Sequence, residues 1–103
     1  MKKVSIKELK EMRQNGDKVF ADFYAEWCGP CKLIMPMLQS LEAEYPSVTF
    51  VKVDVDENNE ECIQMGIVTI PTVMTFNGNN PVSQDKGVQP ITNYRKRLDN
   101  LIN

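Results

Sequence analysis

Hydrophobic and polar positions follow two different rhythms along the chain, one typical of buried strands and one of helices. Residues 18–24 and 49–55 are nearly continuous apolar runs, which is typical of central strands covered on both faces. Residues 72–76 and 82–86 predict a β-hairpin around a turn at residues 77–81, which is rich in Asn, Gly and Pro. A short strand near the N-terminus is expected to join the same sheet.

Helical spacing separates these strands. Ser5 and Glu8 form a capping-box pattern ahead of a first helix that ends at Gly16. A longer helix follows residues 18–24, and Pro36 is expected to kink it. Its apolar stripe is predicted to comprise Leu33, Ile34, Met37, Leu38, Leu41 and Tyr45. Residues 58–65 predict a short third helix, and Pro90 suits the first turn of the last one. The stripe of that last helix is expected to comprise Ile91, Tyr94, Leu98, Leu101 and Ile102.

The order of these elements predicts an α/β fold. Early alternation of strand and helix implies right-handed crossovers and parallel pairing, and the hairpin adds antiparallel strands. We therefore expect one mixed sheet with helices on both faces. No repeat or linker-like stretch interrupts the chain, so residues 1–103 are interpreted as a single domain.

Composition narrows the function classes. The 103 residues are 42% hydrophobic and 25% charged, and the formal net charge is -2, which argues against binding to nucleic acid or to an anionic membrane. No apolar run approaches the roughly 20 residues that span a bilayer, and the first residues show no signal-peptide pattern. Three cysteines are an odd number for a secreted disulfide framework, so a reducing compartment, the cytoplasm, is predicted.

Two closely spaced cysteines, Cys28 and Cys31, carry the candidate chemistry. They lie between a predicted buried strand and a predicted helix, whose N-terminal N–H groups and partial positive charge favour a thiolate. Cys28 is expected to be the exposed nucleophile, and Cys31, one turn further, the shielded resolving thiol. The chain has no histidine, so activation by the helix end is the natural route.

Other interpretations of the cysteine pair remain open at this point. A zinc site needs about four ligands, but only these two cysteines and the distant Cys62 are present, so no metal is expected. A purely structural disulfide would close a very short loop and add little stability. Cys62 is interpreted as a buried inert thiol, with a regulatory or dimer-forming role as the alternative.

At this point the sequence resembles the thioredoxin family. The run from Asp22 to Lys32, Asp-Phe-Tyr-Ala-Glu-Trp-Cys-Gly-Pro-Cys-Lys, is similar to that family's active-site signature, and Thr-Ile-Pro-Thr at 69–72 is similar to its second motif. The resemblance covers essentially the whole chain. It implies the thioredoxin fold and a protein-disulfide reductase that uses Cys28 and Cys31.

The resemblance also assigns roles to supporting residues. Asp22 interrupts an apolar strand, where a carboxylate is costly unless it has a partner, a function or access to solvent at a strand edge. The family pattern implies that Asp22 is buried and exchanges a proton with Cys31. It also implies that Lys52 approaches and tunes that acid, although a surface lysine with its head in solvent fits the sequence nearly as well.

A docking surface for disulfide-containing target proteins is expected beside the cysteines. The resemblance implies a cis Ile70-Pro71 bond facing them, with backbone pairing to an extended target segment. The surface is predicted to comprise Trp27, Gly29, Pro30, Ile70, Pro71, Gly87 and Val88. Tyr24 and Thr69 stand where relatives often carry other residues, so they are candidates for tuning stability or partner choice.

The remaining expectations concern partners and rival functions. No glycine-rich dinucleotide motif is present, so no cofactor is expected on this chain. NADPH and flavin are expected on a separate partner enzyme, thioredoxin reductase. The chain itself is expected to be a monomer. The alternative enzyme function is that of an oxidase or isomerase. A redox titration of the cysteine pair distinguishes it from a reductase by the midpoint potential. A binding subunit or holdase with incidental thiols is the rival from another class.

Overall fold

A five-stranded sheet forms the centre of the protein. The computed structural model describes all 103 residues, and the strand order is β1-β3-β2-β4-β5. The strands span β1 (Lys2–Lys3), β2 (Lys18–Tyr24), β3 (Thr49–Asp54), β4 (Thr72–Asn77) and β5 (Asn80–Lys86). Strands β1 and β2 both pair parallel with β3, whereas β4 pairs antiparallel with β2 and with β5. The predicted mixed sheet is confirmed.

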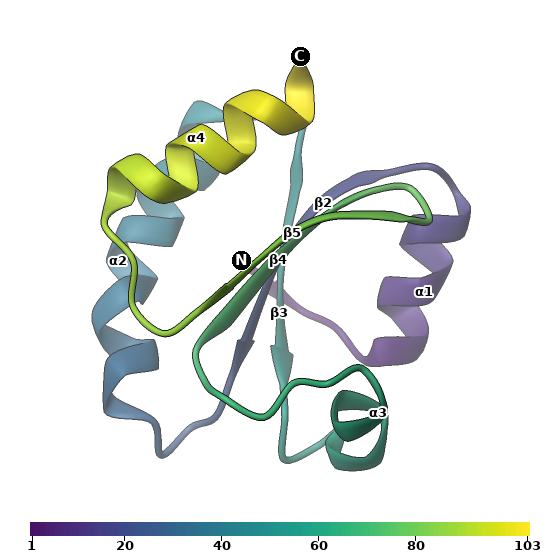
Figure 1. Cartoon of the computed structure of the whole chain (residues 1–103), viewed down its shortest axis with the longest axis vertical. Coiled ribbons are helices and arrows are strands. Elements are labelled where there is room, and N and C mark those ends of the chain that lie inside the picture. The colour runs from purple at the N-terminus through teal and green to yellow at the C-terminus, as the bar shows by residue number, and fades with distance from the viewer.

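Four helices cover the two faces of this sheet. They span α1 (Ile6–Gln14), α2 (Gly29–Glu44), α3 (Asn59–Gln64) and α4 (Ile91–Ile102). Helices α2 and α4 lie together on one face, whereas α1 and α3 lie on the other (Figure 1). The predicted α/β architecture with helices on both faces is therefore confirmed.

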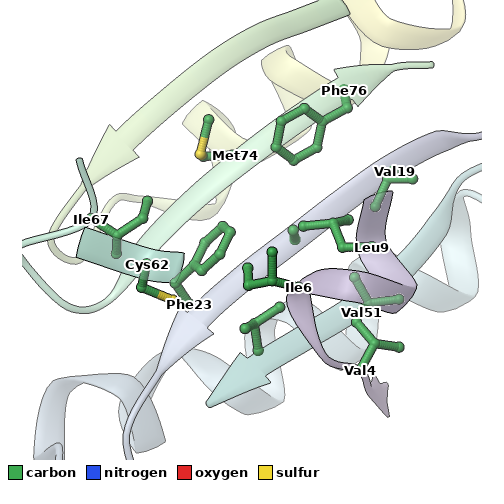
Figure 2. Close-up of a cluster of buried hydrophobic side chains, with 12 residues drawn as sticks. Val4, Ile6, Leu9, Val19, Phe23, Val51, Cys62, Ile67, Met74 and Phe76 are labelled. Atoms are coloured by element: carbon green, nitrogen blue, oxygen red, sulfur yellow. The ribbon is translucent and has the colours of Figure 1, made fainter. Parts of the chain in front are cut away.

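Each face of the sheet has its own apolar core, because successive strand residues point to opposite sides. Val19, Ala21 and Phe23 of β2 pack with α1 and α3, in the cluster of Figure 2 that also contains Ile6, Leu9 and Cys62. Phe20, which alternates with them, packs with α2 and α4 beside Phe50 and Tyr94. This alternation also directs Asp22 and Tyr24 to the α2/α4 face.

The first helix begins as its sequence predicts. The Ser5 hydroxyl accepts the Glu8 N–H at 3.1 Å, and the Glu8 carboxylate accepts the Ser5 N–H at 3.0 Å. Both bonds of the capping box are thus present, and they satisfy donors that a helix end leaves open. Gly16 follows the helix with φ +85, a left-handed conformation that glycine adopts without a steric penalty.

Two positions in the predicted helix stripes were wrong. Leu33 is 75% exposed, and the buried side of α2 begins instead at Cys31 and Ile34. Leu33 precedes Ile34 by one residue, which is about 100° around the helix and outside the buried arc. Ile102, the last residue of α4, is also exposed, since the helix end extends past the sheet. Pro36 lies inside α2 on an exposed position, and the helix continues through it.

The hairpin is tighter than predicted. Strand β4 continues to Asn77 and β5 starts at Asn80, so the turn consists of Gly78 and Asn79 alone rather than residues 77–81. Pro81 is accommodated because it lies on the edge strand, where the register of the ladder shifts opposite Thr75 and Phe76.

Other boundaries differ by one or two residues. Strand β3 ends at Asp54 rather than at residue 55, and α3 is two residues shorter than predicted. Pro90 precedes α4 as its N-cap residue instead of lying in its first turn.

No helix is long and apolar enough to cross a bilayer.

Candidate active site

The cysteine motif lies where β2 leads into α2, at the C-terminal edge of the sheet. Cys28 is the N-cap residue of α2 and Cys31 lies in its first turn; the two sulfurs form a disulfide. The pair packs with Tyr24 and Ala25, and Ile70 lies against this small cluster. The fold therefore brings the motif of residues 22–32 and the motif of residues 69–72 together.

The helix N-terminus acts directly on the Cys28 sulfur. Cys28 Sγ accepts the Cys31 backbone N–H at 3.2 Å, in the position that a serine or aspartate oxygen occupies in other helix caps. Such a contact stabilises a sulfur that carries negative charge. The predicted difference in exposure was wrong for this disulfide state: Cys28 is 4% exposed and Cys31 2%. The disulfide bond holds the two sulfurs together, so both cysteine side chains are buried in the same cluster.

Asp22 is fully buried on the α2/α4 face of β2. Neither of its carboxylate oxygens has a hydrogen-bond partner, although a buried ionised carboxylate needs several. Burial raises the pKa of Asp22 to about 7, and the positive charge of Lys52 opposes this effect. The alternative that Asp22 points to solvent at a strand edge is wrong, because β2 is a central strand with neighbours on both sides.

Lys52 lies next to Asp22 in the sheet. The parallel register pairs Asp22 with Lys52 directly, and the Lys52 side chain is half-buried. Its ammonium lies 5.3 Å from the centroid of the Tyr24 ring. A cleft of about 330 Å³ opens beside these groups, lined by Tyr24, Ala25, Glu26, Cys31, Lys32, Met35, Pro36 and Lys52. The cleft connects Cys31 and Lys52 with solvent on the side of α2.

Two loops meet at the second motif. The Ile70-Pro71 bond is cis, as the resemblance predicted. The Pro71 carbonyl accepts the Gly87 N–H at 2.8 Å, so the residues after β5 are attached to this loop. Gly87 has φ +78, a conformation that a side chain would disfavour. Gly87 and Val88 are thereby held beside Ile70 and Pro71.

The expected docking residues differ in their exposure. Trp27 is 71% exposed and Val88 50% exposed, and Gly29 and Pro30 are exposed as well. Ile70 and Gly87 are half-buried, whereas Pro71 is buried. The motif of residues 22–32 and the loop after β5 therefore each present an exposed apolar side chain, which is a feature of protein-binding sites.

Sequence reasoning missed one residue that shapes this surface. Asp56 accepts a hydrogen bond from the Trp27 indole nitrogen at 2.8 Å and so fixes the orientation of the exposed ring. Trp27 and Asp56 line a pocket of about 300 Å³, and the thiol-bearing residue Cys62 lies there together with Ile63 and Val68. No sequence pattern pairs residues 29 positions apart in this way, so the contact emerges only from the fold.

No side-chain cluster in the protein resembles a metal centre. Groups of three or more His, Cys, Asp or Glu residues close enough to hold an ion do not occur. Cys62 is buried in α3, and burial raises the pKa of its thiol to about 11, with additional contributions from Glu61 and Asp54. The two features that distinguish Cys28 and Cys31 are their helix-end position and their bond to each other.

A disulfide at a helix N-terminus, on a sheet of this topology, defines the class of thiol–disulfide oxidoreductases. Comparisons with known proteins agree. The sequence profile of the thioredoxin family matches residues 2–100. The chain is 44% identical over 89 residues to a thioredoxin of Alicyclobacillus acidocaldarius, an alignment that covers 84% of this chain and 85% of that protein. It is 39% identical over 98 residues to a thioredoxin of Staphylococcus haemolyticus, covering 94% and 93%.

Solved structures give the same result. The X-ray structure of Fasciola hepatica thioredoxin superposes with a TM-score of 0.88 at 30% identity, covering 97% of this chain and 98% of the other. The chain belongs to the thioredoxin family. It is a dithiol–disulfide reductase whose redox group is the Cys28–Cys31 pair. The rival view of a binding subunit with incidental thiols is not supported.

Proposed function

We propose that the protein reduces disulfides in target proteins by attack of Cys28 and release by Cys31. The observation that carries this assignment is the cap of α2, where the Cys28 sulfur accepts the Cys31 N–H at 3.2 Å. The Cys28 thiolate attacks a target disulfide; a mixed disulfide forms and one target thiolate leaves. Cys31 then attacks the Cys28 sulfur, and the second target thiolate leaves. Two electrons pass to the target, and the Cys28–Cys31 disulfide remains.

Asp22 acts in the second step, in which the Cys31 thiol must lose its proton. The carboxylate is buried without hydrogen-bond partners, and its pKa of about 7 suits a proton acceptor near neutral pH. Lys52, its direct neighbour on β3, lowers that pKa and so keeps Asp22 able to ionise. Both residues are proposed to serve the resolving step rather than the initial attack.

The docking surface receives the target segment that carries the disulfide. Exposed Trp27 and Val88 supply apolar contact area, and Ile70 packs against the cluster that contains the redox pair. Gly29 and Pro30 lie between Cys28 and Cys31 and leave the approach to Cys28 free of large side chains. Pro71 and Gly87, joined by their backbone hydrogen bond, hold the loops beneath this surface.

The oxidised pair is recharged by a separate enzyme, thioredoxin reductase, which carries the flavin and NADPH. The chain lacks a glycine-rich dinucleotide motif, which supports this division of labour. The protein is proposed to act as a monomer in the cytoplasm, where a reducing thiol pool favours the dithiol form of the pair. Nucleic acid and membranes are not among its expected partners, given the net charge of -2.

Two cysteine variants test the assignment. Cys28→Ser is expected to abolish reduction of insulin disulfides, because neither Cys31 nor Cys62 has the N-cap position that favours a thiolate. Cys31→Ser is expected to retain the attack but not the release, so that a mixed disulfide between Cys28 and the target accumulates and appears by mass spectrometry. Full activity of Cys28→Ser, or a target trapped on Cys31 instead, would show that the roles are assigned wrongly.

A further inference from the structure

Tyr24 lies at one end of β2, on the same face as Asp22 and close to Lys52. Strand residues two apart share a face, so Tyr24 and Asp22 both point toward α2 and α4. The Tyr24 ring is buried, and the Lys52 ammonium lies over it, 5.3 Å from the ring centroid. Both side chains line the cleft of about 330 Å³ that also reaches Cys31.

We propose that Tyr24 is a positioning residue for the resolving step: its ring holds the Lys52 ammonium in the cleft and so sets the positive charge that Asp22 experiences. The inference rests on the proposed function in one respect, namely that Asp22 exchanges a proton with Cys31. The position of Lys52 itself is a property of the fold and can be measured separately.

The ring is the only directional contact of the Lys52 ammonium. Lys52 takes part in no ion pair within 4 Å and in no side-chain hydrogen bond, unlike Lys3, which is 2.7 Å from Glu57. A lysine side chain has four rotatable bonds and a strongly hydrated head, so an unrestrained head extends into solvent. A cation over an aromatic face is attracted within about 6 Å of the centroid. Without the ring, the half-buried Lys52 is free to leave the cleft.

Other charged groups near Asp22 do not supply the same effect. Glu26 and Lys32 line the cleft but are exposed, so solvent screens their charges. On the other side of Asp22, Asp85 of β5 is paired with Arg97 of α4 at 3.1 Å. Glu26, Cys31 and Lys32 line the cleft beside Lys52. The groups that act on or lie around Asp22 are Lys52 of β3, Tyr94 of α4 and, across β4, the Asp85–Arg97 pair. Among them, Lys52 is the positive charge that acts on the Asp22 carboxyl.

The Tyr24 hydroxyl contributes little to this arrangement. It forms one hydrogen bond, to Glu26 Oε1, at 3.5 Å, the outer limit for such a bond. The aromatic face and the hydroxyl can therefore be separated by substitution. Tyr24→Phe and Tyr24→Trp keep a ring beneath Lys52, whereas Tyr24→Leu removes it.

The test is a carbon-13 NMR titration of the Asp22 carboxyl in the oxidised protein, where neither active-site cysteine titrates. In the unchanged protein the midpoint is expected at about pH 7. Tyr24→Leu is expected to raise it by about half a pH unit, a roughly threefold weaker acid, the size expected for a partly exposed cation–π contact. Tyr24→Phe and Tyr24→Trp are expected to leave the midpoint within about 0.2 of the original value.

The matched control is the same series in a Lys52→Met background. Removing the ammonium is expected to raise the Asp22 midpoint by itself, and Tyr24→Leu is then expected to add nothing. An equal shift from Tyr24→Leu in both backgrounds would mean that the ring acts through packing or hydration, and it would overturn the proposal. So would an unchanged or lowered midpoint in Tyr24→Leu alone.

A kinetic measurement separates this proposal from the proposed role of Asp22. The rate at which Cys31 releases a preformed mixed disulfide is followed against pH. In Tyr24→Leu the rise of this rate with pH is expected to move upward together with the Asp22 midpoint. If Asp22→Asn leaves the release rate unchanged, Asp22 has no function in that step, yet the titration still decides whether Tyr24 positions Lys52. If Tyr24→Leu shifts the Asp22 midpoint but leaves the pH dependence of the release rate unchanged, Tyr24 positions Lys52 without affecting the resolving step, and that part of the proposal is wrong.

Discussion

The protein contains two regions that each combine cysteine in a helix with a buried aspartate of a neighbouring strand, yet the two regions differ in their chemistry. In the first, Cys28 and Cys31 lie at the start of α2 near the buried Asp22 of β2. In the second, Cys62 lies in α3 near the buried Asp54, the last residue of β3. All three cysteines are at most 4% exposed, so exposure does not distinguish the redox group from the free thiol of Cys62.

The two regions differ in whether the groups around the cysteine sulfur favour or disfavour a negative charge on it. Cys28 accepts an N–H at the positive end of a 16-residue helix, whereas Cys62 lies inside a six-residue helix where Glu61 and Asp54 both disfavour a negative charge on its sulfur. The acids differ as well. Asp54 accepts the N–H groups of Asp56 and Glu57 at 2.8 and 3.3 Å, but the Asp22 carboxylate has no partner. In the first region a helix N–H is donated to the Cys28 sulfur, and the nearby Asp22 carboxylate has no hydrogen-bond partner. In the second region Asp54 has hydrogen-bond partners, and the raised pKa of Cys62 keeps its thiol protonated at neutral pH.

The largest expected contrast is in alkylation. With the pKa of Cys62 raised to about 11, about one Cys62 thiol in ten thousand is ionised at pH 7. Thiols at helix N-termini ionise near neutral pH, so reduced Cys28 is expected to react with iodoacetamide at least about 10³ times faster than Cys62. Mass spectrometry of digested protein, sampled over time, gives both rates in one experiment.

Unfolding provides the control for this contrast. In guanidinium chloride the environments of α2 and α3 are lost, and the cysteines are expected to react at similar rates. Comparable labelling of Cys62 and Cys28 in the folded protein would contradict the electrostatic explanation and would make Cys62 a candidate for regulation.

The second contrast is the pH dependence of stability. Because the pKa of Asp22 is raised from 3.8 to about 7, the folded state binds more protons than the unfolded state between about pH 4 and pH 7. The contribution of Asp22 to stability therefore falls as the pH rises through this window, by up to about 4 kcal/mol, and changes little above it. Asp22→Asn removes this dependence. Relative to the unchanged protein, the oxidised variant is expected to gain stability from about pH 4 to about pH 7 and little more above that, as measured by urea unfolding.

Asp54→Ala is the matched substitution in the second region, and its effect is expected to have the opposite sign. Removing this carboxylate leaves the N–H groups of Asp56 and Glu57 without their acceptor, which is expected to cost about 1–3 kcal/mol. If Asp22→Asn destabilised the protein at pH 8 as Asp54→Ala does, Asp22 would have a stabilising partner that its surroundings do not show.

Much of the first region could be predicted from the sequence because its signals are local. The apolar β2 with its single acid Asp22 and the spacing of Cys28 and Cys31 concern residues that are close in sequence, and so does the capping box at Ser5 outside this region. Such patterns determine the start of a helix or the face of a strand directly. The role of Ile70-Pro71 came from resemblance, since an arbitrary X-Pro bond is rarely cis.

The features that the sequence did not reveal depend on contacts between distant segments or on a face chosen by packing. The Trp27–Asp56 bond joins the loop before α2 to the turn after β3, and the Lys52 ammonium contacts the Tyr24 ring only once two strands pair in register. Leu33 was misplaced because adjacent apolar residues leave the buried arc of a helix ambiguous by about 100°. The exposure of Cys28 was overestimated because the disulfide holds it against Cys31.

The smallest expected effect is that of Cys62→Ala. The substitution removes one buried sulfur from the α1/α3 core, a loss comparable to one buried methylene, so unfolding in urea should show a cost of about 1 kcal/mol. Insulin reduction is expected to stay unchanged, because Cys62 donates no electrons. The two regions are nevertheless adjacent, since Cys62 and Trp27 line the same pocket. A tenfold loss of activity at an unchanged fold would therefore show that this pocket transmits packing changes to the docking surface, and that the inert thiol supports the reactive one through Trp27.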